Sequence, residues 1–157
     1  MAIISGRIKA ISVSKQKGMK KGNVPAALLQ VDYGIVGDAH AGKWHRQVSL
    51  LAFESFAEMT AKGANVSPGD FAENITTEGI DLRILKPGDR LRLGVDAELE
   101  ITQSGKRCHR RCEIFKQVGD CIMPREGTFA KVTKGGCIKV GDAIEVFNDQ
   151  NGCIDNK

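Results

Sequence analysis

Cys108, His109 and Cys112 lie within one short basic stretch, residues 104–116. Five residues of the stretch are Lys or Arg and one is acidic, so its local excess of +4 equals the net charge of the whole chain. Neighbouring cationic side chains favour the thiolate, which is the form of cysteine that attacks, carries sulfur or binds a metal. Cys108 is therefore our candidate for a reactive thiol or a metal ligand. The basic residues are Lys106, Arg107, Arg110, Arg111 and Lys116.

Cys112 follows Cys108 by four residues, so the two thiols share one face if a helix holds them. Cys112 then serves as a resolving thiol or a second ligand, or packs inward beside Phe115. Cys108 has its own alternative, a buried thiol near a solvated basic face. The flanking charge favours the functional interpretation of Cys108.

A zinc site is the competing hypothesis, with Cys108, Cys112, Cys121 and a histidine as ligands. The spacing lacks the paired Cys-x2-Cys units that mark structural zinc sites, so the sequence supports this alternative weakly. Cys137 and Cys153 have no charged neighbours in a cluster, and we expect no role for them.

A second candidate stretch, residues 37–51, contains His40, His45, Arg46 and the only tryptophan, Trp44. Two glycines in it allow the backbone to approach a ligand, and His45 and Arg46 can donate to a phosphate. The alternative is a polar loop whose tryptophan covers the core. Because loops carry binding groups, we favour a binding role.

A third candidate is the stretch 71–77, in which Glu73 and Asn74 are the polar members. An asparagine and neighbouring threonines can hydrogen-bond a heterocycle, although strand ends often carry such residues without a ligand.

Composition limits the function classes. The chain has 157 residues, 41% apolar and 27% charged, which is typical of one folded domain. A net charge of +4 is too small and too local for bulk nucleic-acid binding, so a small anion such as phosphate is the better partner. The first twenty residues contain no apolar run of signal-peptide length, and no stretch has the length of a membrane span. Five cysteines without such a signal indicate a reducing, cytoplasmic location.

The elements that must position these residues are short strands. Gly-Asp occurs five times, twice after proline, and Pro-Gly-Asp favours tight turns. One helix is expected over Ala52–Lys62, with Gly63 beyond its end, and a second from Cys108 or His109 to about Val118. We therefore predict a mostly-β, closed or partly open barrel of about eight strands over residues 1–147, followed by a flexible tail, 148–157. The expected strands are Gly6–Val13, Ala26–Val31, Gln47–Leu51, Phe71–Thr76, Asp89–Leu93, Ala97–Thr102, Gly127–Val132 and Ala143–Phe147, with Lys15–Asn23 as an exposed loop.

Several ordered motifs together resemble the MOSC domain family, named after the C-terminal domain of molybdenum-cofactor sulfurase. The likeness runs from about Ile4 to Val146 and is strongest to the small stand-alone bacterial branch. The motifs are Gly37-Asp-x-His40-x-Gly42, Arg46-Gln47-Val-Ser-Leu-Leu51, Gly69-Asp-Phe-x-Glu73-Asn74-Ile, Leu85-x-Pro-Gly-Asp89, and Ile101-Thr-Gln103 followed by Cys108.

The resemblance implies a mostly-β barrel that binds the molybdenum cofactor (molybdopterin). The family's cysteine corresponds to Cys108, which would carry sulfur as a persulfide or ligate molybdenum. Many relatives read Thr-Gln-Pro-Arg-x-Pro-Cys, where this chain reads Thr-Gln-Ser-Gly-Lys-Arg-Cys. The residues expected to hold the pterin and its phosphate are His40, His45, Arg46, Glu73, Asn74, Gln103, Lys106, Arg107, His109, Arg110, Arg111 and Arg125; Glu73, Asn74 and Gln103 alternatively fix the loop.

Three roles are compatible with the resemblance. The chain is a sulfur-carrying transferase component of cofactor maturation, a non-catalytic carrier that hands the cofactor on, or part of a reductase of N-hydroxylated compounds. No pyridoxal-phosphate site is expected, so a separate cysteine desulfurase would supply sulfur and a molybdoenzyme would receive the product.

Overall fold

The computed structural model describes residues 4–17, 19–104 and 127–147 of the chain, and the structural statements below concern these residues. They form a mostly-β architecture with one short α-helix, so the predicted fold class is confirmed for the described part of the chain. No helix among them is long and apolar enough to cross a membrane.

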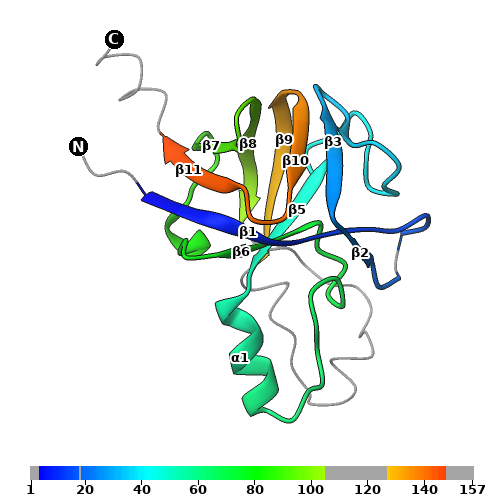
Figure 1. Ribbon diagram of the computed structural model, residues 1–157, viewed down its shortest axis with the longest axis vertical. Helices are drawn as coiled ribbons and strands as arrows, with labels where there is room; N and C mark the ends of the chain where they lie inside the picture. The colour runs from blue at the N-terminus through cyan, green and yellow to red at the C-terminus, as the bar shows by residue number, and fades with distance from the viewer. Residues whose placement is uncertain (1–3, 18, 105–126, 148–157) are drawn as a thin grey trace.

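Seven of the described strands close into a barrel. Each is hydrogen-bonded to the next, and β1 and β11 pair to complete the circle, with Ile4 opposite Val146 and Arg7 opposite Ala143. Figure 1 shows these two strands side by side. Around the barrel the order is β1 (Ile4–Val13), β11 (Ala143–Phe147), β7 (Arg90–Leu93), β8 (Ala97–Ser104), β9 (Thr128–Lys134), β5 (Val48–Ala52) and β6 (Ile75–Glu78), and β2 (Gly22–Val24) adds to β1.

A separate small sheet consists of β10 (Gly136–Lys139), β3 (Ala26–Gln30) and β4 (Gly34–Ile35). Leu29 and Ile138 on this sheet are buried and belong to the same apolar cluster as the barrel interior. The sheet therefore packs over the barrel and holds the end of β4, from which the loop to β5 departs.

Alternation along the strands builds the core. In β8 the buried residues are Ala97, Leu99 and Ile101, separated by half-exposed neighbours, as expected for a strand with one face inside. A fully buried side chain such as Leu99 stabilises the fold by roughly 1.5–3 kcal/mol relative to an exposed one.

The β5–β6 pair is the parallel one among the described ladders, and a parallel pair needs a crossover connection. Helix α1 (Glu54–Ala61) lies in that connection. It buries Phe56 and Met59 in a second apolar cluster that also contains Leu51, Phe71 and Phe129. Gly63, with φ of +99°, follows the helix end as predicted.

Three details of the sequence prediction are wrong. The expected strand Phe71–Thr76 begins only at Ile75, because residues 69–73 form a turn in which Ala72 has a φ of +63°. The segment Lys15–Asn23 is not wholly an exposed loop, since it contains the start of β2 and a buried lysine, Lys21. Strands β2, β4 and β10 were not expected; each has four residues or fewer, too few to show a period. The predicted second helix and the tail lie outside the described residues.

Candidate functional site

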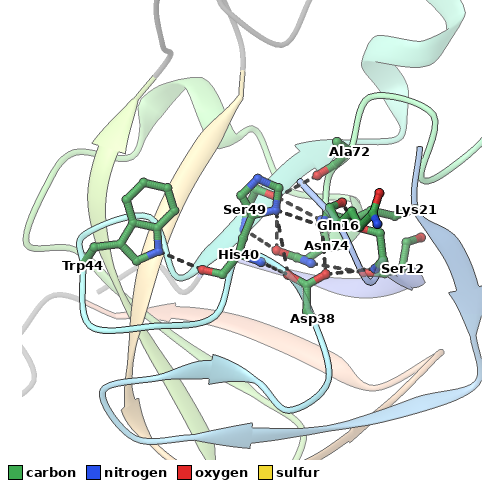
Figure 2. Close-up of polar contacts among 10 residues, drawn as sticks. Ser12, Gln16, Lys21, Asp38, His40, Trp44, Ser49, Ala72 and Asn74 are labelled. Carbon is green, nitrogen blue, oxygen red and sulfur yellow. Dashed lines mark hydrogen bonds and ion pairs between the residues drawn. The ribbon is translucent and has the colours of Figure 1, made fainter. Parts of the chain in front are cut away.

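The polar loop, residues 36–47, joins β4 to β5. It contains His40, Trp44, His45 and Arg46 of the second candidate stretch. Asp38 anchors it from inside the protein. One carboxylate oxygen, Oδ1, accepts hydrogen bonds from the Ser14 backbone N–H (3.1 Å) and from Lys21 Nζ (2.8 Å). The other, Oδ2, accepts from the His40 backbone N–H at 3.0 Å. Figure 2 shows Lys21 and His40 beside Asp38.

Lys21 and Asp38 form an ion pair. The pair is buried, since both side chains have an exposed fraction of 0%. Its ammonium group also lies 3.0 Å from Ser14 Oγ and 2.9 Å from His40 Nδ1. Burial raises the pKa of Asp38, but the hydrogen bond and charge of Lys21 and the N–H groups of Ser14 and His40 outweigh it. The pKa of Asp38 therefore lies below its usual value, and the carboxylate is ionised at neutral pH.

Trp44 contacts several residues of the polar loop and stabilises its middle part. Its indole N–H donates to the His40 carbonyl oxygen at 2.7 Å, and its ring is nearly parallel to the His40 ring, with centroids 6.4 Å apart. Two cations contact the indole ring: Lys17 Nζ lies 4.6 Å and the Arg46 guanidinium carbon 4.9 Å from its centroid. Cation–π attraction of this kind contributes roughly 0.5–2 kcal/mol each.

His45 connects the polar loop to the end of β8. Its Nε2 lies 2.9 Å from the side-chain oxygen of Gln103, and its carbonyl oxygen accepts a hydrogen bond from the Thr102 hydroxyl. Two predicted site residues that are 58 positions apart in the sequence are thus brought into direct contact.

Arg46 lies over two aromatic rings, since its guanidinium carbon is also 5.6 Å from the Phe129 ring centroid. Its Nε atom is buried and has no hydrogen-bond partner among the described residues. A buried guanidinium N–H without an acceptor is uncommon, because leaving such a donor unsatisfied costs about 1–3 kcal/mol. Arg46 is therefore suited to donate a hydrogen bond to an anionic or carbonyl oxygen of a ligand.

Asn74 is fully buried and holds three segments together. Its side-chain oxygen accepts from the Ser49 backbone N–H at 3.0 Å, and its amide group donates to the Ser12 carbonyl at 3.1 Å. Its own backbone N–H donates to the Ser49 carbonyl at 2.9 Å. These contacts join β1, β5 and the turn before β6, behind the polar loop (Figure 2).

Glu73 is also fully buried, and protein groups occupy its carboxylate. Oε2 accepts from the Gly69 N–H and the Thr76 hydroxyl, both at 2.8 Å, and Oε1 accepts from the Phe71 N–H at 3.2 Å. Burial raises the pKa of Glu73, and these hydrogen bonds offset the increase only in part. Glu73 and Asn74 were predicted either to contact the pterin or to fix the loop. Their described contacts link protein segments to one another, as expected for the second role.

The structure therefore brings His40, His45 and Arg46 into contact with Trp44, and Gln103 into contact with His45, whereas Glu73 and Asn74 are buried in the interior. The remaining predicted residues lie outside the described part of the chain, and their roles stay predictions. They are Lys106, Arg107, Cys108, His109, Arg110, Arg111, Cys112 and Arg125.

Sequence reasoning missed the ion pair of Lys21 and Asp38. A signal for Asp38 existed, because it follows a glycine in one of the five Gly-Asp pairs. Asp70, Asp89 and Asp142 each accept from a backbone N–H three residues earlier, as a turn aspartate does. Asp38 bonds the His40 N–H two residues later, but also Ser14 and Lys21, 24 and 17 positions away, and no local pattern reveals those two contacts.

No group of three or more His, Cys, Asp or Glu side chains suited to a metal is found within residues 4–17, 19–104 and 127–147. A cavity of about 360 Å³ lies between α1 and the short 3-10 helix η1 (Leu82–Ile84), lined in part by Glu54, Glu58 and Arg83. None of the predicted site residues lines it, so we assign the candidate site to the surroundings of the polar loop.

Comparison with known proteins gives a family and a fold. The MOSC domain family matches residues 37–145, more than half of the chain. The YuaD protein from Bacillus subtilis has a similar structure, with a TM-score of 0.77 and 21% sequence identity over 92% of this chain and 97% of that one. YiiM from Geobacillus stearothermophilus gives 0.69 and 18%, covering 91% and 75% of the two chains. YiiM from Escherichia coli gives 0.64 and 17%, covering 90% and 70%. No curated protein matches the sequence closely enough to count as a relative.

Proposed function

This chain belongs to the MOSC domain family, and on that premise we propose that it binds the molybdenum cofactor and handles sulfur or metal through Cys108. The observation that carries the proposal is the cluster of Trp44, His45 and Arg46, which His45 connects to Gln103 near the end of β8. That strand leads directly into the basic stretch that contains Cys108.

The described residues fit an anionic ligand with polar edges. Arg46 lies over the Trp44 ring and offers a cation whose buried Nε has no partner among the described residues. A pterin carries a phosphate, which a guanidinium recognises, and a heterocycle whose polar edges a side-chain amide can hydrogen-bond. Arg46 and His45 would hold the phosphate, and Gln103 would donate or accept at the heterocycle.

Chain length keeps Cys108 near these groups. Cys108 follows Ser104 by four residues, and four residues of fully extended chain span at most about 14 Å. A thiol within that distance of β8 can reach a ligand bound at Gln103 and His45. The basic neighbours of Cys108 in the sequence favour its thiolate, which is the form needed both for metal ligation and for sulfur transfer.

Sulfur transfer to Cys108 needs a donor protein and no separate oxidant. The Cys108 thiolate would attack the outer sulfur of a persulfide on a cysteine desulfurase, forming the new S–S bond of a Cys108 persulfide. The donor's S–S bond breaks at the same time, and its cysteine leaves as a thiolate. A nucleophilic thiolate of the recipient molybdoenzyme would then attack the outer sulfur, and Cys108 would leave as a thiolate.

The first experiment is mass and metal analysis of the protein purified gently from a molybdenum-competent host. We expect bound pterin or molybdenum in the wild type and its loss in Cys108→Ala. A mass increase of about 32 Da on Cys108, one sulfur atom, indicates the persulfide instead. Cys137→Ala is the matched control, because Cys137 is an exposed free thiol on β10. Stoichiometric zinc in place of cofactor and sulfur would overturn the proposal.

A second experiment tests the polar loop separately from the thiol. Arg46→Gln removes the charge-assisted hydrogen bond proposed for the ligand, which is worth about 1.5–3 kcal/mol, so retained cofactor should fall roughly tenfold or more. Lys43→Gln changes the charge of the same loop at an exposed position and should leave retention unchanged. Equal retention in the two variants would remove Arg46 from the site.

A further inference from the structure

The ammonium group of Lys21 fixes the direction of the hydrogen bonds around it. A lysine ammonium has three N–H donors and no acceptor. Lys21 lies within 3.0 Å of three polar atoms, Asp38 Oδ1, Ser14 Oγ and His40 Nδ1. All three atoms must therefore accept from it. Ser14 is free to do so because its own hydroxyl donates to the Gln16 carbonyl at 3.0 Å.

This direction decides where the proton of His40 lies. A ring nitrogen accepts a hydrogen bond only when it carries no proton, so Nδ1 of His40 is unprotonated while Lys21 donates to it. The single N–H of the neutral ring is then on Nε2. An imidazolium would direct an N–H from Nδ1 against the lysine N–H groups at a separation of 2.9 Å.

Asp38 acts on His40 in the opposite sense. Its Oδ2 lies 4.0 Å from His40 Nδ1 and would favour an N–H there. Lys21 is closer, at 2.9 Å, and Coulomb energy falls with distance, so the cation has the stronger effect on Nδ1. Asp38 is also occupied, since its Oδ2 accepts from the His40 backbone N–H. Without Lys21, the remaining arrangement is a histidine–aspartate pair, in which a histidine serves as a base.

The position of His40 is fixed from both sides. Its N–H donates to Asp38, and its carbonyl oxygen accepts from the Trp44 indole. On the side of Trp44, the titratable groups Lys17 and His45 both contact the indole ring that lies nearly parallel to His40. The His40 side chain is 25% exposed and lies at the boundary between the buried ion pair and the polar loop (Figure 2).

We propose that Lys21 is a positioning residue that keeps His40 neutral with its proton on Nε2, so that His40 serves the site as a hydrogen-bond donor and not as a base. The ligand atom that this N–H recognises is an acceptor such as a carbonyl or phosphate oxygen. The proton assignment stands on the contacts of Lys21 alone. Its use in ligand binding rests on the proposed function.

The proton assignment is tested on the ligand-free wild type by nitrogen-15 NMR of the histidine rings. The ring nitrogens of a protonated and an unprotonated site resonate far apart, and His40→Gln identifies the signals of His40 among the three histidines. We expect one His40 nitrogen at the limit for an unprotonated Nδ1 and the other at the limit for Nε2–H. A proton on Nδ1, an imidazolium at neutral pH, or an averaged mixture of tautomers overturns the proposal.

Lys21→Met tests the cause. With the ammonium removed, Asp38 is the charged group that faces Nδ1, and the proton should move to Nδ1 or the ring should become an imidazolium. Lys20→Met, at an exposed neighbour, should leave the His40 spectrum unchanged. An unchanged spectrum in folded Lys21→Met contradicts the proposal. If that variant does not fold, the wild-type spectrum decides alone.

The donor role is tested by cofactor retention from the same host. His40→Phe removes the N–H and should lower retained cofactor about tenfold, whereas His40→Gln should restore part of it because the glutamine amide can replace Nε2–H. Equal retention in His40→Phe and wild type removes the donor role. Absence of cofactor from the wild type defeats the proposed function but leaves the NMR assignment intact, so the two failures are distinguishable.

Discussion

Asp38 and Glu73 are two buried carboxylates whose surroundings differ in a single component. Each accepts hydrogen bonds from two backbone N–H groups and from one side chain. For Asp38 that side chain is the buried ammonium of Lys21, and its pKa is lowered; for Glu73 it is the neutral hydroxyl of Thr76, and its pKa is raised. The neutral donors around Glu73 stabilise the turn at residues 69–73, but they do not fully offset the desolvation of the Glu73 carboxylate.

The comparison separates two uses of a buried acid. Glu73 shapes backbone, since it connects Gly69, Phe71 and Thr76 within one turn. Asp38 pairs with Lys21, whose ammonium we propose to set the protonation of His40 in the polar loop. Gly69 joins the two regions, because its N–H donates to Glu73 and its carbonyl oxygen accepts from the Lys21 N–H at 2.9 Å. A Cβ at this position would lie 2.2 Å from the Lys21 carbonyl oxygen.

The largest effect is expected from Lys21→Met, which removes the component that distinguishes the two carboxylates. It leaves the Asp38 charge buried without its cation, and breaking a buried pair in this way costs about 3–5 kcal/mol. Urea unfolding measures the loss, with Lys20→Met as the exposed control. A loss below about 1 kcal/mol would mean that Asp38 does not depend on Lys21.

Glu73→Ala should have the next largest effect. It leaves the buried N–H groups of Gly69 and Phe71 without an acceptor, and each such group costs about 1–3 kcal/mol, so we expect a loss of about 2–4 kcal/mol. Glu58→Ala, on the exposed face of α1, should change the free energy of unfolding by less than about 0.5 kcal/mol. Similar urea midpoints for the two variants would show that the turn does not need the carboxylate.

A smaller effect with opposite signs is expected in the pH dependence of stability. The pKa of Asp38 is lowered on folding, so its contribution is complete above the ordinary aspartate value of about 3.9 and is lost as the pH falls through the folded value. The pKa of Glu73 is raised, so its ionisation costs stability as the pH rises from about 4.3 through the folded value.

Urea midpoints between pH 2 and 7 test both signs. Relative to Asp38→Asn, the wild type should gain stability with rising pH; relative to Glu73→Gln, it should lose stability. Slopes of the same sign would invalidate the comparison between the two carboxylates.

The smallest effect concerns Ala72, which precedes Glu73 and has a φ of +63°. Non-glycine residues are strained in this region, so Ala72→Gly should stabilise the protein by about 0.5–1 kcal/mol. The same substitution at Ala57, exposed within α1, should destabilise by a similar amount because glycine is a poor helix former. Thermal unfolding of the two variants should therefore shift in opposite directions.

Local patterns were sufficient to predict the fold class and the turns. Proline–glycine–aspartate at 68–70 and 87–89 predicts tight turns, and Gly69 and Gly88 have φ values of +97° and +99°. Asp70 and Asp89 bond the backbone N–H groups of Ser67 and Lys86 as expected. These interactions involve residues three positions apart, which is why the sequence reveals them.

Long-range pairs in the candidate site were not predictable in the same way. Lys21 lies among exposed lysines, and its burial depends on Asp38, 17 positions later. The prediction of a strand from Phe71 failed because Glu73 bonds N–H groups of its own turn, which alternation of apolar residues does not encode. His45 contacts Gln103, a proximity that no sequence pattern indicated, and their role toward a ligand stays a prediction.

The pairing of β1 with β11 sets the time at which folding can finish during synthesis. Residues 4–7 pair with residues 143–146, so nearly the entire described sequence separates the two sides of this ladder. While the ribosome is still translating, that part of the β1 edge has no strand to bind and is exposed to strands of other chains. The barrel can close only after β11 has emerged, and we expect chaperone binding to be needed most in that interval.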